Sequence, residues 1–157
     1  MLQAVYLESS IISYLAARPS RDIIVAARQQ LTQEWWQRRR SAFDIYVSEL
    51  VLAEIQAGDP EAAERRSAVI DGIALLEISD EATDLAEYIV LDAGLPEKAA
   101  ADALHIAIAA CHGMHYLLTW NAAHIANAEL RPRVEALCRG KGYGPPVLCT
   151  PDELMGI

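Results

Sequence analysis

Short apolar segments alternate with helix-forming segments along nearly the whole chain, and this alternation restricts the fold more than any other feature. The apolar segments lie at residues 3–8, 43–47, 74–78, 116–120 and, more weakly, 147–149. Strands that alternate with helices form a parallel sheet, because each helix supplies the long connection that parallel neighbours need. The sequence therefore predicts an α/β fold whose mostly parallel sheet is covered by helices on both faces.

Turn and capping residues divide the segments between the strands into helices. Hydroxyl side chains are typical helix N-caps, and a Pro that follows an Asp marks a first turn. The expected caps are Ser9-Ser10 for a helix over 11–15, Ser20 for a long helix over about 21–40, Ser48 after the second strand, and Asp59-Pro60. Further helices are expected over about 80–92, 97–112 and 127–140.

The length and composition predict a single domain over residues 1–157 that acts in the cytoplasm. Of the 157 residues, 53% are apolar and 22% are charged, which is typical of a globular protein. No apolar run reaches the roughly 18 residues of a membrane span, and no basic region or cleavage site of a secretory signal follows Met1. The three cysteines are widely spaced, so small buried thiols in a reducing compartment are expected.

The formal net charge of -9 argues against nucleic-acid binding by general electrostatics. This charge does not exclude an enzyme that reaches phosphates through a metal ion. The basic residues are grouped, and each group is either a solvated helix face or part of a phosphate-contacting rim around an acidic centre. The groups are Arg38-Arg39-Arg40, Arg65-Arg66, and Arg131, Arg133, Arg139 and Lys141.

Four oxygen-bearing residues follow or interrupt apolar segments, and they are the candidate catalytic and metal-binding residues. They are Glu8, Glu54, Asp102 and Asn121. The ends of parallel strands and the starts of the following helices converge on one crevice of an open sheet. Carboxylates gathered there repel one another unless a cation joins them. The arrangement predicts a hard divalent metal ion and a hydrolytic reaction.

The first two acids differ in how strongly their surroundings require a partner. Glu8 ends the first strand, where it could hold a metal or merely stabilise the following helix, and Ser10 could add a ligand or act only as a cap. Glu54 lies in an apolar stretch, where a carboxylate is costly unless it reaches a partner. Glu49, the nearby alternative, needs no more explanation than the helix dipole, so Glu54 is favoured.

The second half of the chain supplies the other two candidates and a histidine. Asp102 interrupts a run of alanines, and His105 lies three residues later on roughly the same helix face. His105 could contact substrate, hold Asp102 through a hydrogen bond, or simply pack at a helix boundary. Asn121 could offer a carbonyl oxygen or make an Asx turn.

A ligand set made of oxygens favours Mg²⁺ or Mn²⁺ as the cofactor. His112 and His115 form a poor zinc pair without further ligands. Neither common type of glycine-rich phosphate loop is present, and no set of residues suggests a covalent route.

Four segments, in this order, resemble the PIN domains of VapC-like toxin ribonucleases from type II toxin–antitoxin pairs. The segments are Val5-Tyr6-Leu7-Glu8-Ser9-Ser10, Ser48-Glu49-Leu50-Val51-Leu52-Ala53-Glu54-Ile55, Ala101-Asp102-Ala103-Leu104-His105-Ile106-Ala107 and Leu118-Thr119-Trp120-Asn121. The resemblance covers nearly the whole chain. It implies a three-layer α/β/α sandwich and metal-dependent hydrolysis of RNA phosphodiester bonds.

Carried over residue by residue, the resemblance makes Glu8, Glu54 and Asp102 the acidic ligands and puts Asn121 in the fourth position. Ser10 matches the small polar position after the first acid. Similar proteins commonly form homodimers and are silenced by a cognate antitoxin, whose tail covers the acidic site. A dimer or antitoxin groove could include Trp35 and Trp36, although burial in the core explains these residues equally well.

One departure from the family pattern concerns activity. The first acid is usually Asp, and the additional methylene of Glu8 moves the carboxylate outward by about one bond. Misplacement by about 1 Å can cost on the order of a hundredfold in rate. The alternative function is therefore a PIN-like RNA- or protein-binding module with weak or no catalysis. A phosphotransfer receiver or an aspartyl phosphatase fits poorly, because Glu8-Ser9-Ser10 supplies neither the acid pair nor the Asp-x-Asp motif.

Overall fold

Five parallel strands form the centre of the computed structural model, which describes residues 1–157. The strands are β1 (Gln3–Leu7), β2 (Phe43–Ser48), β3 (Ala74–Leu76), β4 (Tyr116–Leu118) and β5 (Val147–Cys149). Their order in the sheet is β3-β2-β1-β4-β5, so the first strand lies in the middle. All four pairings are parallel. The parallel sheet predicted from the sequence is confirmed.

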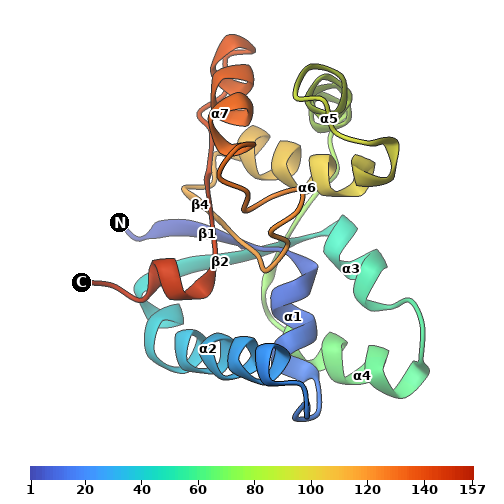
Figure 1. Ribbon diagram of the computed structural model, residues 1–157, viewed down its shortest axis with the longest axis vertical. Helices are drawn as coiled ribbons and strands as arrows, with labels where there is room; N and C mark the ends of the chain where they lie inside the picture. The colour runs from blue at the N-terminus through green and yellow to red at the C-terminus, as the bar shows by residue number, and fades with distance from the viewer.

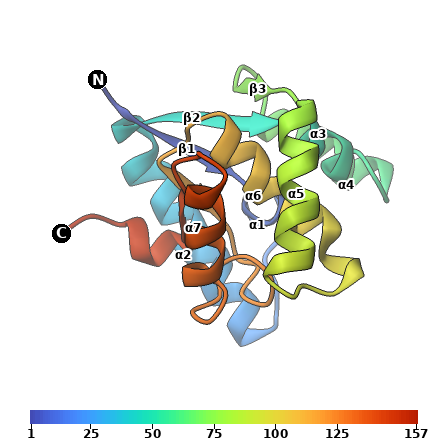
Figure 2. The same ribbon diagram turned by 90° about the horizontal axis from the view of Figure 1, so that it is seen from above.

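Helices cover both faces of this sheet. They are α1 (Ser9–Ala16), α2 (Ile23–Arg39), α3 (Glu49–Ile55), α4 (Pro60–Val69), α5 (Asp80–Asp92), α6 (Ala100–Cys111) and α7 (Arg131–Gly140), with short 3₁₀ turns at Arg40–Ala42, Glu97–Ala99 and Pro151–Leu154. In Figure 1, α1, α2 and α4 lie below the strands, whereas α5, α6 and α7 lie above them. Figure 2 looks down on the layer of α5, α6 and α7, with β1 and β2 running behind it. The predicted α/β/α sandwich is confirmed.

Two of the expected helix caps are wrong. Asp22 caps α2, because its Oδ1 accepts the backbone N–H of Val25 at 2.9 Å, and Ser20 instead accepts the N–H of Asp22. Glu8, rather than Ser9 or Ser10, caps α1. An acidic side chain at a helix N-terminus gains from the helix dipole as well as from the hydrogen bond.

The other predicted boundaries differ from the structure by a few residues. Ser48 and Asp59 cap α3 and α4 as expected. The helix expected over 127–140 begins only at Arg131, because the side chain of Asn127 accepts the backbone N–H groups of Glu129 and Leu130 in a turn. Local side-chain acceptors of this kind compete with helical hydrogen bonding. The predicted strands 74–78 and 116–120 end at residues 76 and 118.

A single cluster of 32 buried apolar residues forms the core. The indole ring of Trp35 is fully buried and stacks on Phe43, with ring centroids 6.0 Å apart. Trp35 therefore packs in the core, while Trp36 is partly buried and has the guanidinium of Arg40 over its ring at 4.4 Å. No helix has both the length and the apolar character that crossing a membrane requires.

The chain between α6 and β4 turns at Gly113, whose φ of 70° suits a residue without a Cβ. The N–H of Met114 donates to the carbonyl of Ala109 at 2.9 Å, and that of Gly113 donates to Ala110 at 3.1 Å. This pair of bonds is a Schellman motif that ends α6. It directs the chain into β4, and so places the residues after Leu118 beside the end of β1.

Candidate active site

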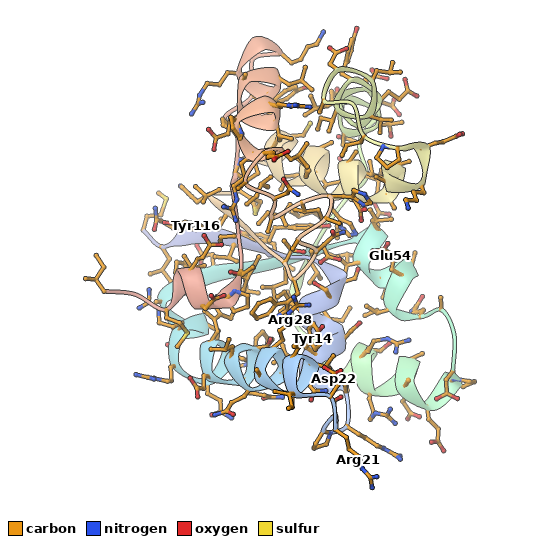
Figure 3. The ribbon with its side chains drawn as sticks, in the orientation of Figure 1. Tyr14, Arg21, Asp22, Arg28, Glu54 and Tyr116 are labelled. Atoms are coloured by element: carbon orange, nitrogen blue, oxygen red, sulfur yellow. The ribbon has the colours of Figure 1, made fainter.

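The carboxyl ends of β1, β2 and β4 meet at one edge of the sheet. Leu7 is paired with Leu118, and the N–H of Glu8 donates to the carbonyl of Leu118 at 3.0 Å. The residues that follow β1 and β4 therefore leave the sheet side by side. Helix α3 starts directly after β2 and reaches the same region, where Glu54 lies near its end (Figure 3).

Glu8 is buried, at 7% exposure, and its carboxylate is held by hydrogen bonds on both oxygens. Its Oε1 accepts the hydroxyls of Ser10 at 2.5 Å and Thr119 at 2.6 Å, and its Oε2 accepts the backbone N–H of Ser10 at 3.1 Å. A carboxylate oxygen offers two acceptor positions. Oε2 therefore has one position free, while both positions of Oε1 are used.

Glu54 lies on α3 with its side chain about one-third exposed, at 35%. Its Oε1 accepts the hydroxyl of Ser9 at 2.6 Å and the Nε2–H of His105 at 2.6 Å. Burial by itself would raise the pKa of Glu54, but the hydrogen bond and the charge interaction with His105, together with the hydrogen bond from Ser9, outweigh burial and lower the pKa. Glu54 is therefore an anion at neutral pH, and its Oε2 accepts no hydrogen bond within the protein.

A buried chain of hydrogen bonds runs behind Glu54. The hydroxyl of Tyr6 lies 2.6 Å from Nδ1 of His105 and 2.7 Å from Oγ of Ser48, whose oxygen also accepts the N–H of Val51. Burial, and to a smaller extent the charges of Glu8 and Glu54, raise the pKa of Tyr6 well above its usual value, so the phenol keeps its proton. Each polar hydrogen of this chain has an acceptor when Ser48 donates to Tyr6, Tyr6 donates to Nδ1 of His105, and Nε2 of His105 donates to Glu54.

The two carboxylates and the histidine form one group of candidate ligands. One ligand atom each from Glu8, Glu54 and His105 lie within 4.8 Å of one another. No Lys or Arg forms an ion pair with either carboxylate. Two anions this close, without a cationic side chain, fit a divalent cation. The free acceptor positions are on Glu8 Oε2 and Glu54 Oε2, while both nitrogens of His105 already have partners.

Asp102 and Asn121 are joined to each other through His124, not to this group of three residues. The Nδ1 of His124 lies 3.0 Å from Oδ2 of Asp102, and its backbone N–H donates to Oδ1 of Asn121 at 2.9 Å. Asn121 therefore makes the Asx turn that was one of the two expectations for it. Asp102 is partly exposed, at 23%, and its Oδ1 accepts no hydrogen bond within the protein.

His105 does not hold Asp102, although the two residues lie three apart on α6. His105 is 1% exposed and its ring reaches Glu54 and Tyr6, whereas the Asp102 carboxylate reaches His124. A separation of three residues turns the helix about 60° short of a full revolution. That rotation sends the two side chains to different neighbours.

Several neighbours of the site were missed by the sequence analysis. They are Tyr6, Ser48 as a hydrogen-bond partner, Thr119 and His124. A hydroxyl within or at the end of an apolar strand is a weak signal, because Tyr and Thr are common strand residues. His124 could have been noticed by its spacing of three residues after Asn121, which is the reach of an Asx-capped turn.

The remaining polar candidates have other roles. Oε1 of Glu49 accepts the backbone N–H of Ile78 at 2.7 Å, so Glu49 ties α3 to the segment after β3. Nε2 of His112 contacts the carbonyl of Glu77, and Nδ1 of His115 accepts the N–H of Ala4.

Together, the parallel sheet, the helices on both faces and the acidic residues at the carboxyl edge define an α/β/α domain with one candidate site. A scan of protein-family models finds no match to the sequence, and a search of curated proteins finds no significant match. Comparison of the fold with solved structures finds 16 matching chains.

Three of the matching structures come from different bacteria. The VapC20 toxin of Mycobacterium tuberculosis, described as cleaving the sarcin-ricin loop, is 14% identical with a TM-score of 0.60, over 88% of this chain and 95% of that one. FitAcB of Neisseria gonorrhoeae is 16% identical with a TM-score of 0.59, over 96% and 99%. VapBC2 of Rickettsia felis, bound to a DNA fragment from its promoter, is 15% identical with a TM-score of 0.56, over 94% and 98%.

The three alignments cover most of both chains, so the likeness concerns the whole domain and not one motif. The chain has the fold of the PIN-domain toxins, as its sequence motifs predict.

Proposed function

We propose that this protein is a Mg²⁺- or Mn²⁺-dependent endoribonuclease that hydrolyses RNA phosphodiester bonds, and that it is the toxin of a toxin–antitoxin pair. The observation that carries the proposal is that the carboxylates of Glu8 and Glu54 lie close together at the carboxyl edge of the sheet, and that no Lys or Arg forms an ion pair with either of them. The likeness to VapC20, a toxin that cleaves the sarcin-ricin loop, supports RNA as the substrate.

Glu8 and Glu54 would hold the ion through their free oxygens, with Asp102, in the first turn of α6, and Asn121, in the loop after β4, as the other two ligands. When bound, such an ion lowers the pKa of a water molecule and polarises a phosphoryl oxygen. The free Oδ1 of Asp102 agrees with a ligand role. The amide of Asn121 adds no negative charge, so the site favours one ion over two.

The surrounding residues keep the two carboxylates fixed before any ligand arrives. Ser10 and Thr119 hold Glu8, while Ser9 and His105 hold Glu54. Groups fixed in this way need no reorganisation during the reaction, which is how a preorganised site lowers a barrier. Glu8 and Glu54 also provide acceptors that can orient an attacking water molecule toward a phosphate.

The test is cleavage of a defined RNA by purified protein in Mg²⁺ or Mn²⁺. Chelation with EDTA should abolish cleavage, and Glu54→Gln and Asp102→Asn should each lower the rate by at least a hundredfold. Glu49→Gln is the matched control, because Glu49 lies on the same helix but binds the Ile78 amide, and this variant should retain activity. Full cleavage in EDTA would overturn the metal-dependent mechanism.

Metal binding can be measured separately from activity. Calorimetric titration of Mn²⁺ into wild type, Glu54→Gln and Asp102→Asn shows whether one ion requires both acids. Loss of affinity in both variants is expected if Glu54 and Asp102 share an ion. Loss in Glu54→Gln alone would remove Asp102 from the set of ligands.

A second function is favoured by one observation, the three hydrogen bonds on Glu8. These bonds hold its carboxylate against α1 and leave a single free acceptor position, as suits a PIN-like module that binds RNA or protein with weak or no catalysis. Glu8→Asp distinguishes the two functions. A large gain in cleavage would indicate an enzyme weakened by Glu8, whereas zero activity in both forms favours the binding module.

We further propose a cytoplasmic homodimer that is silenced by a cognate antitoxin. The likeness to VapBC2 supports such a partner. Light scattering after gel filtration would test the dimer. Co-expression with the product of an adjacent gene, followed by copurification and loss of ribonuclease activity, would test the antitoxin.

A further inference from the structure

Trp120 lies at the centre of an aromatic and cationic cluster beside the acidic site. The guanidinium of Arg28, on α2, lies over its ring at 5.5 Å from the centroid, and Tyr14, on α1, meets it edge to face at 6.3 Å. Figure 3 shows Arg28 reaching from α2 toward Tyr14 and the sheet, whereas Arg21 points away from the molecule. All three members of this Trp120 cluster are partly exposed.

Trp120 is held by hydrogen bonds on its backbone and on its indole ring, and Ser10 connects its backbone to Glu8. Its backbone N–H donates to Oγ of Ser10 at 2.9 Å, and the same hydroxyl donates to the Glu8 carboxylate at 2.5 Å. Its indole Nε1–H donates to Oγ1 of Thr32 at 2.7 Å. The cluster therefore has a fixed position relative to the acidic site, with one serine between them.

The guanidinium of Arg28 forms no ion pair and donates no hydrogen bond within the protein. Other arginines do: Arg131 and Arg139 pair with glutamates, and Arg66 donates to backbone carbonyls. The chain carries 22 acidic residues against 13 basic ones, yet none of its acids forms an ion pair with Arg28. Five N–H donors of a partly buried guanidinium are thus available to an external acceptor.

We infer that Arg28, held on the ring of Trp120, contacts a phosphate of the RNA strand where it reaches the acidic site, and that Tyr14 and Trp120 provide a stacking surface for the adjoining base. The inference rests on the proposed function, and it names the residues that receive a single-stranded substrate. The guanidinium plane matches phosphate geometry, and aromatic rings beside a cation are typical of sequence-tolerant binding to single strands.

The position of the Trp120 cluster favours RNA over a protein ligand. The Arg28 guanidinium lies beside a site whose own charge is negative. A bound polyanion therefore needs a positive contact next to the acids. A net charge of -9 offers little general attraction, and therefore individual arginines must supply the phosphate contacts.

The experiment measures binding of a fluorescent single-stranded RNA dodecamer over a series of KCl concentrations, with EDTA present to prevent cleavage. For single strands, each phosphate contact contributes about 0.7 to the slope of log K against log salt. Arg28→Ala should lower the slope by about 0.7 and weaken binding. Arg28→Lys should keep the slope but bind more weakly than wild type, because an ammonium group lacks the planar stacking on Trp120.

Arg21→Ala is the matched control, because Arg21 is exposed and points away from the molecule (Figure 3), and it should behave as wild type. Circular dichroism melting curves identify any variant that fails to fold, and Arg28→Lys then carries the test. A wild-type slope in Arg28→Ala would overturn the inference while leaving the proposed nuclease intact, and would direct attention to a protein ligand for the Trp120 cluster. Weaker binding at an unchanged slope would overturn the phosphate contact.

Two further outcomes separate the inference from the proposed function. RNA binding with the expected slopes, but without cleavage in Mn²⁺, would support Arg28 as a phosphate contact and overturn the nuclease. A wild-type protein that binds no RNA in EDTA but cleaves it in Mn²⁺ would overturn the inference and leave the nuclease intact.

Discussion

Removal of one buried oxygen atom tests whether Tyr6 organises the candidate site. Tyr6→Phe deletes the hydroxyl that lies between Ser48 and His105 at 2.7 and 2.6 Å, in a side chain with no exposed surface. Ser48 keeps the N–H of Val51 as a donor, but Nδ1 of His105 is left buried without a partner. An unsatisfied buried group costs about 1–3 kcal/mol.

That cost predicts a fall of about 2–12 °C in the melting temperature of a domain of this size, and a matching fall in the free energy of unfolding by urea. Tyr116→Phe is the control, because the Tyr116 hydroxyl makes only a long, exposed contact of 3.4 Å with Gln3. The control should change stability by less than about 0.5 kcal/mol. ¹⁵N NMR of the imidazole should show a proton on Nε2 of His105 in the wild type. Equal, small losses in both variants would refute the role of Tyr6.

Three other properties of the chain are open to direct measurement. The pKa of Glu54 is lowered by folding, so its carboxylate stabilises the fold at neutral pH and loses this contribution as the pH falls below the ordinary value of 4.5. In EDTA, the difference in unfolding free energy between wild type and Glu54→Gln should therefore shrink below that pH; a constant difference would contradict the lowered pKa. Burial raises the pKa of Cys138 to about 11 and of Cys149 to about 12, so iodoacetamide at pH 8 should modify the partly exposed Cys111 first, as mass spectrometry of the native protein would show. Asp22→Ala should cost about 0.5–2 kcal/mol in urea unfolding, and a neutral result would mean that its cap contributes little.

The order of strands and helices could be predicted because each segment has an apolar pattern of its own. The choice of cap could not, since Ser20 and Asp22 are both good N-cap residues two positions apart. Only the folded chain shows that Asp22 takes the Val25 amide, and that Ser20 binds Asp22 in turn. The helix predicted to start at about residue 127 starts at Arg131 for a similar reason, because the side chain of Asn127 accepts backbone N–H groups in a local turn.

At the candidate site, the sequence indicated which charges needed partners but not what the partners were. Glu54 stood out because its neighbours along the chain are apolar. Its actual partners, Ser9 and His105, lie 45 and 51 residues away in the sequence. Such pairs depend on the packing of α1 and α6 against α3, which local patterns do not encode. The separation of Asp102 from His105 has the same origin.

The central position of β1 has a consequence for protein synthesis. Glu8 emerges from the ribosome among the first residues, but its hydrogen-bond donor Thr119 lies 111 residues later. At about 5–20 residues per second, the carboxylate waits roughly 6–22 s for that partner. β1 also lacks its β4 neighbour during this time, so one hydrogen-bonding edge of β1 stays open until β4 has been made. A nascent chain therefore has no assembled candidate site until most of its length has been made, so the proposed nuclease would stay inactive toward the ribosome that produces it.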